Sequence, residues 1–467
     1  MSSSSSSGAG ASSRKASSRD PSFRDSSARA SSAAAAPGRG FRNPLDAWLA
    51  RQCGVQDTDA NTLARALREA RARALTRCLN HAAARSAFYA RSLAGYDLER
   101  FTPEDMRGLP FTTADDLARW EDFLCVSRGE VQRMVTLRTS GTTGSPKRLA
   151  FTETDLARTV DFFRVGMSQL VRPGQKLAVL LPGAARPDGV ADLLRQSLSP
   201  CGVEVCTPPQ DLLVPAKSLQ QGFVKRTPPV LPIQKMVQEG VAHCALGSCP
   251  SARVATPQAA LAGIHPDIVQ WLDEVRPHCL VAAPGQLEGL LRHFPKSGPP
   301  GLCGLLSSAD RLDPVLGHVL STVWNCTVLD HYGLTETAYG GAVECPAHDG
   351  YHLRLLDLVV EIVDFCGDEP LPPGETGEVV ITTLEREAMP LIRYRTGDVA
   401  CLLPGPCACG SPLSRLGPVQ GRLERCGNRV RVVQMPKGGT QAGASVRQDR
   451  SGHDGPYCTV GDWEGLM

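Results

Sequence analysis

The amino-acid sequence predicts an α/β fold: a large domain of mixed, largely parallel sheets with flanking helices, and a smaller β-rich subdomain. Three observations predict this class. Short β-rich runs alternate with helical runs between residues 131 and 206, and the same rhythm returns between residues 266 and 330. From Leu353 to Leu403, strands separated by turns follow one another without a helix. Because a helix is the usual crossover between two parallel strands, the alternation indicates parallel sheets.

The elements of the core follow from local patterns. Apolar and β-branched runs predict strands, and apolar residues three and four positions apart predict helices. On this basis we expect strands at 131–137, 177–181, 203–206, 279–283, 304–307 and 327–330, and helices at 155–170, 189–197, 266–275 and 285–291. Upstream, Leu63, Leu67 and Ala74 describe one face of an amphipathic helix. Residues 207–257 break the rhythm with several Pro, which indicates an irregular insertion.

Changes of pattern divide the chain into five segments. Residues 1–45 contain 15 Ser and almost nothing apolar, which predicts a disordered Ser/Ala/Arg-rich tail. Residues 46–130 are predicted to be a helical lead-in, and residues 131–352 the α/β core. Residues 353–420 would form the β-rich subdomain. The segment 421–467 soon becomes polar and aperiodic, so we expect it to be largely disordered.

Length and composition exclude several classes of protein. The 467 residues are enough for two or three domains. The 50 Lys and Arg are balanced by 48 Asp and Glu, so there is no basic field for a nucleic-acid backbone. No segment approaches the roughly 20 apolar residues that a membrane span requires. We therefore expect neither a nucleic acid nor a membrane as a partner.

The most informative segment follows the first strand of the core and is rich in small and hydroxylated residues. Small side chains leave backbone N–H groups free to face a ligand, and hydroxyls and Lys147 add donors and a positive charge, which suits a polyphosphate. It differs from a Walker A loop, because Ser145 and Pro146 separate the second Gly from the Lys. The residues predicted to bind phosphates are Thr139, Ser140, Gly141, Thr142, Thr143, Gly144 and Lys147.

Two further motifs lie downstream of this loop. They are Tyr332-Gly333-Leu334-Thr335-Glu336 and Tyr394-Arg395-Thr396-Gly397-Asp398. Together with the loop, they resemble the adenylate-forming (AMP-binding) acyl-CoA synthetase superfamily. The lead-in ending in Leu109-Pro110-Phe111-Thr112-Thr113 and the Glu344-Cys345 pair resemble its phenylacetate-CoA ligase and coenzyme F390 synthetase branch. The resemblance implies that residues 131–352 are an adenylation core.

Residue chemistry and this resemblance together suggest roles at the phosphates. Glu336 lies in a Gly-containing turn after the predicted strand 327–330, and open parallel sheets bind ligands at such turns. The resemblance implies that Glu336 holds Mg²⁺ against the phosphates of ATP and that Thr335 contacts the α-phosphate. The predicted catalytic residues are therefore Lys147, Thr335 and Glu336. For Glu336 alone, a solvated acid is the alternative.

Roles at the nucleoside follow in the same way. Asp398 comes after a Thr-Gly turn, and its acceptor-only carboxylate suits two ribose hydroxyls, a contact that the resemblance also implies. A turn-capping Asp is the alternative. By resemblance, Tyr332 offers its ring to adenine and Arg422 approaches the ribose. The other side of the adenine would be lined by Ser307, Ser308 and Ala309.

A second set of residues has the composition of a metal site. Cys345 and His352 are separated by six residues, and Cys407 and Cys409 follow far downstream. Two such pairs of soft ligands can converge into a tetrahedral Cys3His zinc site, in which His348 is a rival to His352. Some members of the resembling branch carry a structural zinc at matching positions. The alternative is that these are incidental thiols in a chain with 17 Cys.

The resemblance implies an acid-thiol ligase. A substrate carboxylate would attack the α-phosphorus of ATP to give an acyl-adenylate and pyrophosphate, and coenzyme A would then take the acyl group. The cofactors expected are ATP, Mg²⁺, coenzyme A and a structural Zn²⁺. The small residues of 282–285 and 339–341 lie where the acyl pocket of the family would be, and they suggest room for an aryl or other bulky acid as the small-molecule partner.

Members of the resembling family continue into a mobile C-terminal domain whose Lys contacts the reacting carboxylate. From Gly421 only 47 residues remain, and Lys437 lies too near the hinge to match that Lys. The sequence therefore predicts that this domain is mostly missing and that turnover is slow or is completed by a homodimer or another complementing chain. The alternative function is a nucleotide-binding relative without full turnover, acting as a binding or regulatory module.

Cysteine usage suggests a location. An odd number of Cys, with no apolar signal segment near Met1, predicts reduced thiols and a cytoplasmic protein. The Ser-, Ala- and Arg-rich start also resembles an organellar transit peptide. An organelle is therefore the alternative location.

Overall fold

A five-stranded parallel sheet forms the centre of the segment between residues 176 and 329. The computed structural model describes residues 43–56, 59–137, 147–181, 184, 189–213, 264–426 and 429–434. In it the strand order of this sheet is β4-β3-β5-β6-β7. The strands are β3 (Lys176–Val179), β4 (Glu204–Cys206), β5 (Cys279–Ala282), β6 (Gly304–Ser307) and β7 (Thr327–Leu329). Every residue of β5 is buried, as expected for the middle of a helix-covered parallel sheet.

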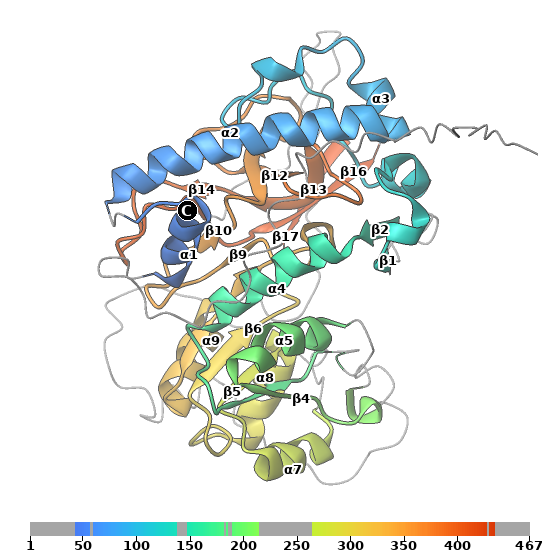
Figure 1. Cartoon of the computed structure of the whole chain (residues 1–467). Coiled ribbons are helices and arrows are strands. Elements are labelled where there is room, and N and C mark those ends of the chain that lie inside the picture. The colour runs from blue at the N-terminus through green and yellow to red at the C-terminus, as the bar shows by residue number, and fades with distance from the viewer. Residues whose placement is uncertain are drawn as a thin grey trace, which may run out of the picture. The chain divides into compact units, whose positions relative to one another are not determined.

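Four helices pack on this sheet and share one hydrophobic core with it (Figure 1). They are α5 (Val190–Leu198), α7 (Pro266–Val275), α8 (Pro284–His293) and α9 (Pro314–Trp324). The last three begin with Pro, whose missing N–H costs nothing at the first position of a helix. The helices predicted at 189–197, 266–275 and 285–291 are observed as α5, α7 and α8, and the one predicted at 155–170 is observed at Glu153–Met167, with ends shifted by at most one turn. Helix α9 was not predicted. The predicted α/β fold with a parallel sheet and flanking helices is confirmed.

The strands after Asp330 form two antiparallel sheets. One has the order β11-β12-β13-β16-β17 and the other β14-β15-β10-β9-β8. In chain order they are β8 (His331–Tyr332), β9 (Ala342–Val343), β10 (Tyr351–Leu353), β11 (Leu358–Val363), β12 (Gly377–Thr383), β13 (Tyr394–Ala400), β14 (Leu402–Leu403), β15 (Arg415–Leu416), β16 (Gly421–Cys426) and β17 (Arg429–Gln434). Upstream, β1 (Arg133–Leu137) and β2 (Lys147–Phe151) also pair antiparallel. Among the named strands of the described residues, parallel pairing occurs in the sheet between residues 176 and 329, and an isolated parallel bridge joins Thr112 to Tyr394.

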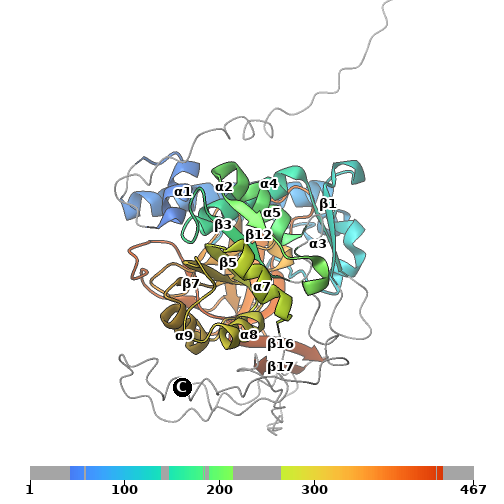
Figure 2. The same cartoon turned by 90° about the horizontal axis from the view of Figure 1, so that it is seen from below.

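Strands β16 and β17 lie side by side at the edge of their sheet (Figure 2). They extend it beyond residue 420, where the sequence predicted the β-rich subdomain to end. Strand β16 pairs with β13, with Arg422 opposite Asp398. This register places an arginine beside the predicted ribose-binding carboxylate. The rest of the predicted C-terminal segment, most of the N-terminal tail and most of 207–257 lie outside the described residues.

The lead-in consists of α1 (Pro44–Gln52), α2 (Ala60–Arg85) and α3 (Ala87–Ser92), followed by short 3-10 turns. Asp59 caps the N-terminus of helix α2, because its side chain accepts a hydrogen bond from the N–H of Thr62 at 2.8 Å. The predicted apolar face of α2, with Leu63, Leu67 and Ala74, is buried in a core shared with β12 and β13 (Figure 1). No helix in the described ranges is long and apolar enough to cross a membrane.

Helix α4 (Glu153–Met167) lies between the two cores. Its Phe163 packs against both hydrophobic clusters. The helix begins with a capping box: Thr152 Oγ1 accepts from the N–H of Asp155 at 3.1 Å, and Asp155 Oδ2 accepts from the N–H of Thr152 at 3.0 Å. Because β2 ends at Phe151, this box fixes the strand that begins with Lys147 to the helix that joins the two cores.

Candidate functional site

The candidate site lies at the carboxyl ends of β6 and β7, where open parallel sheets bind ligands. Ser307 ends β6, is fully buried, and its hydroxyl has no hydrogen-bond partner among the described residues. Ser308 Oγ lies 2.8 Å from His331 Nε2, just past the end of β7. Ala309 has a φ of 77°, which non-glycine residues rarely adopt. The predicted adenine-side residues 307–309 therefore occupy a sharply turned segment at the ligand-binding edge of the sheet.

Lys147 and Glu336 come from distant segments, and their side chains meet. Lys147 Nζ lies 3.5 Å from Glu336 Oε1 and donates a hydrogen bond to Tyr394 Oη at 3.2 Å. Tyr394 Oη donates in turn to Glu336 Oε1 at 2.9 Å. Burial, followed by the charge of Glu336, raises the pKa of Tyr394, so its hydroxyl keeps the proton that it donates. Tyr394 thus couples the predicted phosphate-binding lysine to the predicted metal-binding carboxylate.

Asp398 lies in the same region as Glu336 and is held by two donors. Tyr332 Oη donates to Asp398 Oδ2 at 3.0 Å, and Arg422 Nε lies 3.4 Å from Asp398 Oδ1. Burial raises the pKa of Asp398, whereas Arg422 and Tyr332 oppose the rise. The charge of Glu336 also raises this pKa, so the two carboxylates lie within electrostatic reach of each other. The structure therefore brings Lys147, Glu336 and Asp398 to one place.

The turn that carries Thr335 and Glu336 is fixed by its backbone. Residues 335–337 form a 3-10 turn, and Thr337 Oγ1 accepts from the N–H of Leu334 at 3.0 Å. A Cβ on Gly333 would lie 2.3 Å from the carbonyl oxygen of Tyr339, so a side chain is excluded there. The glycine of the motif thus lets the chain fold back closely and present Glu336.

The two glycines after this turn are closely packed by their neighbours. A Cβ on Gly340 would lie 2.8 Å from Phe162 Cδ1 of α4, and one on Gly341 would lie 3.3 Å from the carbonyl oxygen of Tyr332. Close packing therefore disfavours a side chain at Gly340 and Gly341, and room for a bulky acid beside them stays a prediction. The other predicted acyl-pocket segment behaves differently, because a Cβ on Gly285 would meet nothing within 4 Å.

The structure describes some of the predicted site residues and leaves others outside the described ranges. The loop residues Thr139 to Gly144 lie outside the described residues. Sequence reasoning missed Tyr394, although it stands in the same motif as Asp398. Residues two and four apart in a strand share a face, so the strand period already places Tyr394, Thr396 and Asp398 together. That signal could have identified Tyr394 before its contacts were known.

Comparison with known proteins agrees with this geometry. Residues 243–384 match the family model described as AMP-binding enzyme. The phenylacetate-coenzyme A ligase of Thermus thermophilus is 28% identical over 377 residues, which cover 77% of this chain and 70% of that ligase. That of Pseudomonas putida is 42% identical over 98 residues, which cover 21% of this chain and 22% of that ligase. The chain is thus similar in sequence to phenylacetate-coenzyme A ligases.

Solved structures show that this chain has the fold of the adenylate-forming CoA ligases. The crystal structure of 2-hydroxyisobutyryl-CoA ligase in the postadenylation state, in complex with 2-HIB-AMP, has a TM-score of 0.59 at 17% identity. The match covers 85% of this chain and 74% of that one. An open conformation of the same ligase has a TM-score of 0.57. The predicted adenylate-forming fold is confirmed.

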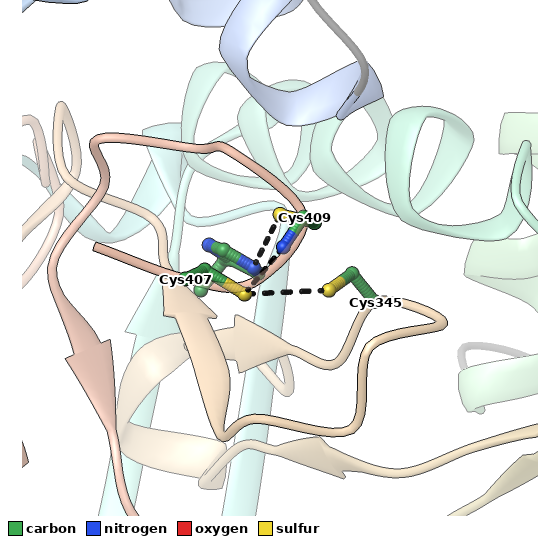
Figure 3. A group of neighbouring side chains, drawn as sticks. Cys345, Cys407 and Cys409 are labelled. Atoms are coloured by element: carbon green, nitrogen blue, oxygen red, sulfur yellow. Dashed lines mark hydrogen bonds between the residues drawn. The ribbon is translucent and has the colours of Figure 1, made fainter.

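The structure also brings together the four predicted soft ligands. The ligand atoms of Cys345, His352, Cys407 and Cys409 all lie within 4.8 Å of one another. The three cysteines point toward one another in Figure 3, with Cys345 Sγ and Cys407 Sγ 3.8 Å apart. His352 Nε2 lies 3.6 Å from Cys409 Sγ. Three sulfurs and one imidazole nitrogen fit the ligand set of a closed structural zinc site.

The rival histidine is excluded from this cluster. His348 is exposed, and its Nδ1 lies 3.3 Å from Glu344 Oε2 rather than near the cysteines. Twelve cysteines of the described segments have free thiols, as the sequence predicts, whereas Cys366 is disulfide-bonded. The other Cys and His of the predicted insertion, His243, Cys244 and Cys249, lie outside the described residues.

Proposed function

We propose that this chain activates a carboxylic acid with ATP and Mg²⁺ to give an acyl-adenylate and pyrophosphate. The observation that carries the proposal is the meeting of Lys147, Glu336 and Asp398, from three separate segments, at the carboxyl edge of a parallel sheet. A lysine, a buried carboxylate and a second carboxylate held by Tyr332 suit phosphates, a divalent metal and a ribose, respectively. One nucleotide would satisfy all three.

Each residue has a defined task in the proposed reaction. A substrate carboxylate oxygen attacks the α-phosphorus, and pyrophosphate leaves with the electron pair of the broken P–O bond. Lys147 offsets phosphate charge, with Thr335 beside the α-phosphate, and Asp398 accepts from the ribose hydroxyls. Glu336 offers a hard oxygen ligand that fits Mg²⁺, and that ion when bound would neutralise phosphate charge. Such chemistry needs alignment and charge rather than a protein nucleophile.

The acceptor and the acid class are further parts of the proposal. The curated relatives are named phenylacetate-coenzyme A ligases, which supports an aryl acid as substrate and coenzyme A as the thiol acceptor. In the second step the thiol sulfur attacks the acyl carbon, and AMP leaves.

Pyrophosphate release with a panel of aryl and aliphatic acids tests the proposal. We expect release that needs ATP, Mg²⁺ and an acid, and an adenylate mass that becomes a thioester when coenzyme A is added. ATP binding without release would instead favour a nucleotide-binding module. Absence of both would overturn the assignment.

Two substitutions test the residue roles. Lys147→Ala and Glu336→Gln should each lower kcat/KM for ATP by about a hundredfold, because each removes a charge that faces the phosphates. Their matched controls are Arg148→Ala, the exposed neighbour of Lys147, and Glu375→Gln in an exposed turn. Both controls should stay within about twofold of the parent chain. Unchanged kinetics in both Lys147→Ala and Glu336→Gln would contradict the roles.

We further propose that Cys345, His352, Cys407 and Cys409 hold a structural zinc ion. The support is the convergence of four ligand atoms from two distant segments, together with their partial or complete burial. A closed set of four ligands leaves no position for substrate, so the role is structural. The ion would join β9 and β10 to the segment between β14 and β15.

A further inference from the structure

Arg386 touches both halves of the site without belonging to either motif. It lies in the loop 384–393 between β12 and β13. Its Nη2 donates a hydrogen bond to the carbonyl oxygen of Glu336 at 3.3 Å. Its guanidinium carbon lies 4.7 Å from the ring centroid of Phe151, the last residue of the strand that begins with Lys147. One arginine thus contacts the turn of the predicted metal-binding carboxylate and the strand of the predicted phosphate-binding lysine.

Arg386 forms no ion pair with the described residues. Burial lowers its pKa, and no carboxylate of the described residues lies within ion-pair distance of it. Its Nη1 is buried without a hydrogen-bond partner beside a cavity of about 280 Å³, a volume that includes the part open to solvent. Arg158 and Arg354 line the same cavity, and both pair with Asp357. Arg386 is half-buried, and the charges of Asp155 and Asp357 favour its charged form without an ion pair. A buried Nη1 that makes no hydrogen bond is costly, which indicates a task beyond packing.

The loop that carries Arg386 is anchored to the helix after β2. Asp155 Oδ1 accepts from the N–H of Glu387 at 2.8 Å, and Asp155 Oδ2 accepts from the N–H of Ala388 at 3.1 Å. Thr152 Oγ1 donates to Glu387 Oε2 at 3.0 Å. These anchors are the capping residues of α4, so the guanidinium is held in a fixed place between the strand of Lys147 and the turn of Glu336.

We propose that Arg386 is a positioning residue that fixes the Glu336 turn so that its carboxylate faces Lys147 and the metal–phosphate position. The inference rests on the proposed function for its catalytic consequence. The hydrogen bond holds the backbone of Glu336 on one side, while Lys147 and Tyr394 hold its carboxylate on the other. A glutamate whose backbone and carboxylate are both held presents the carboxylate in one orientation, which lowers the entropic cost of ordering it around a metal.

The test compares Arg386→Gln and Arg386→Lys with the matched control Arg158→Gln. Arg158 lines the same cavity and is ion-paired, but no hydrogen bond joins it to Glu336 in the described structure. We expect Arg386→Gln to raise the Mg²⁺ concentration for half-maximal pyrophosphate release about tenfold, with partial rescue by Arg386→Lys. Arg158→Gln should lower thermal stability without moving the Mg²⁺ requirement.

Amide hydrogen exchange in the turn 335–339 supplies a readout that needs no activity. Arg386→Gln should speed exchange of these amides about tenfold, and Arg158→Gln should not. Unchanged exchange, or an equal change in both variants, overturns the positioning role. If Arg386→Gln speeds exchange but the parent chain releases no pyrophosphate, the result would support the positioning role and contradict the proposed reaction.

Discussion

Two neighbouring residues at the end of β7 show how burial sets charge beside the site. Burial raises the pKa of Asp330 to about 7 and lowers the pKa of His331 to about 4. Asp330 accepts hydrogen bonds from Tyr351 Oη at 2.9 Å and from the N–H of Leu312 at 3.2 Å. The charge of Glu344 also favours its protonated form. Between pH 4 and 7 both side chains therefore favour their neutral forms, which suits a polar wall that carries no charge of its own.

The two pKa shifts predict contributions to stability that change with pH in opposite directions. The folded pKa of Asp330 is above its ordinary value of 3.8, so the folded state binds more protons between those values and the free energy of unfolding falls as pH rises. His331 acts in the opposite sense, because its folded pKa is below 6.5. Asp330→Asn should remove the Asp330 contribution, so the stability of the parent chain relative to this variant should fall from pH 5 to pH 8.

Urea unfolding of the parent chain and Asp330→Asn at both pH values measures this difference. A shift of about three units sets a ceiling of about 4 kcal/mol on the full change. The control is Asp273→Asn, which alters an exposed carboxyl on α7. A gap between the parent chain and Asp330→Asn that is the same at pH 5 and pH 8 would contradict the assignment.

At the scale of elements, β13 is held in register by a buried carboxylate on its neighbour β12. Glu378 is fully buried and accepts from Arg395 Nη1 at 2.7 Å and from the N–H of Gly397 at 3.2 Å. Arg425 Nη1 on β16 also donates to it at 3.0 Å. Three strands thus meet at one carboxylate. Because Tyr394 and Asp398 share this strand, the network supports the site without contacting it.

Glu378→Gln should destabilise the fold by about 3 kcal/mol, because it removes one partner of a buried charge network and leaves Arg395 without its counterion. Equilibrium unfolding in urea measures the loss. The matched control is Glu424→Gln, whose exposed pair with Arg431 lies in the β16–β17 hairpin and should contribute less than about 1 kcal/mol. Equal effects of the two substitutions would show that burial does not set the strength of this network.

At the scale of the whole molecule, the cysteine cluster contains residues from segments some 60 residues apart. The same two segments also pair in one sheet, where Tyr351 and His352 of β10 lie opposite Leu416 and Arg415 of β15. A bound ion would add to folding free energy, since the unfolded chain does not hold the ligands together. The cluster therefore connects the chain between β9 and β10 to the turn between β14 and β15.

Metal analysis of the purified chain should find about one zinc per molecule, and a chelator should lower the melting temperature by roughly 5 °C or more. Cys409→Ser should reduce the zinc content sharply, because it removes one of four ligands. The control Cys303→Ser changes an exposed thiol outside the cluster and should retain the metal. Metal-free protein whose melting temperature does not respond to zinc or chelator would refute the structural role.

Local patterns determined much of the fold in advance. Helix α7 and strand β6 were predicted with the ends that the structure shows, because their periodicity and their Pro or Gly boundaries are written within a few residues. The antiparallel sheets were not predicted as such. Strand β10 pairs with β9 and with the distant β15, and no local pattern records which distant segment completes a sheet.

The sequence by itself determined the ordered motifs around Lys147, Glu336 and Asp398, since residue type and spacing limit the chemistry that such segments perform. Only the tertiary structure decided that Tyr394 bridges the first two, that His352 rather than His348 lies with the cysteines, and that Arg386 donates a hydrogen bond to the carbonyl oxygen of Glu336. Each of these contacts joins residues at least 50 positions apart in the sequence. The reason is physical: a side chain's partners depend on which surfaces the whole chain buries together, and that is settled only when the cores have packed.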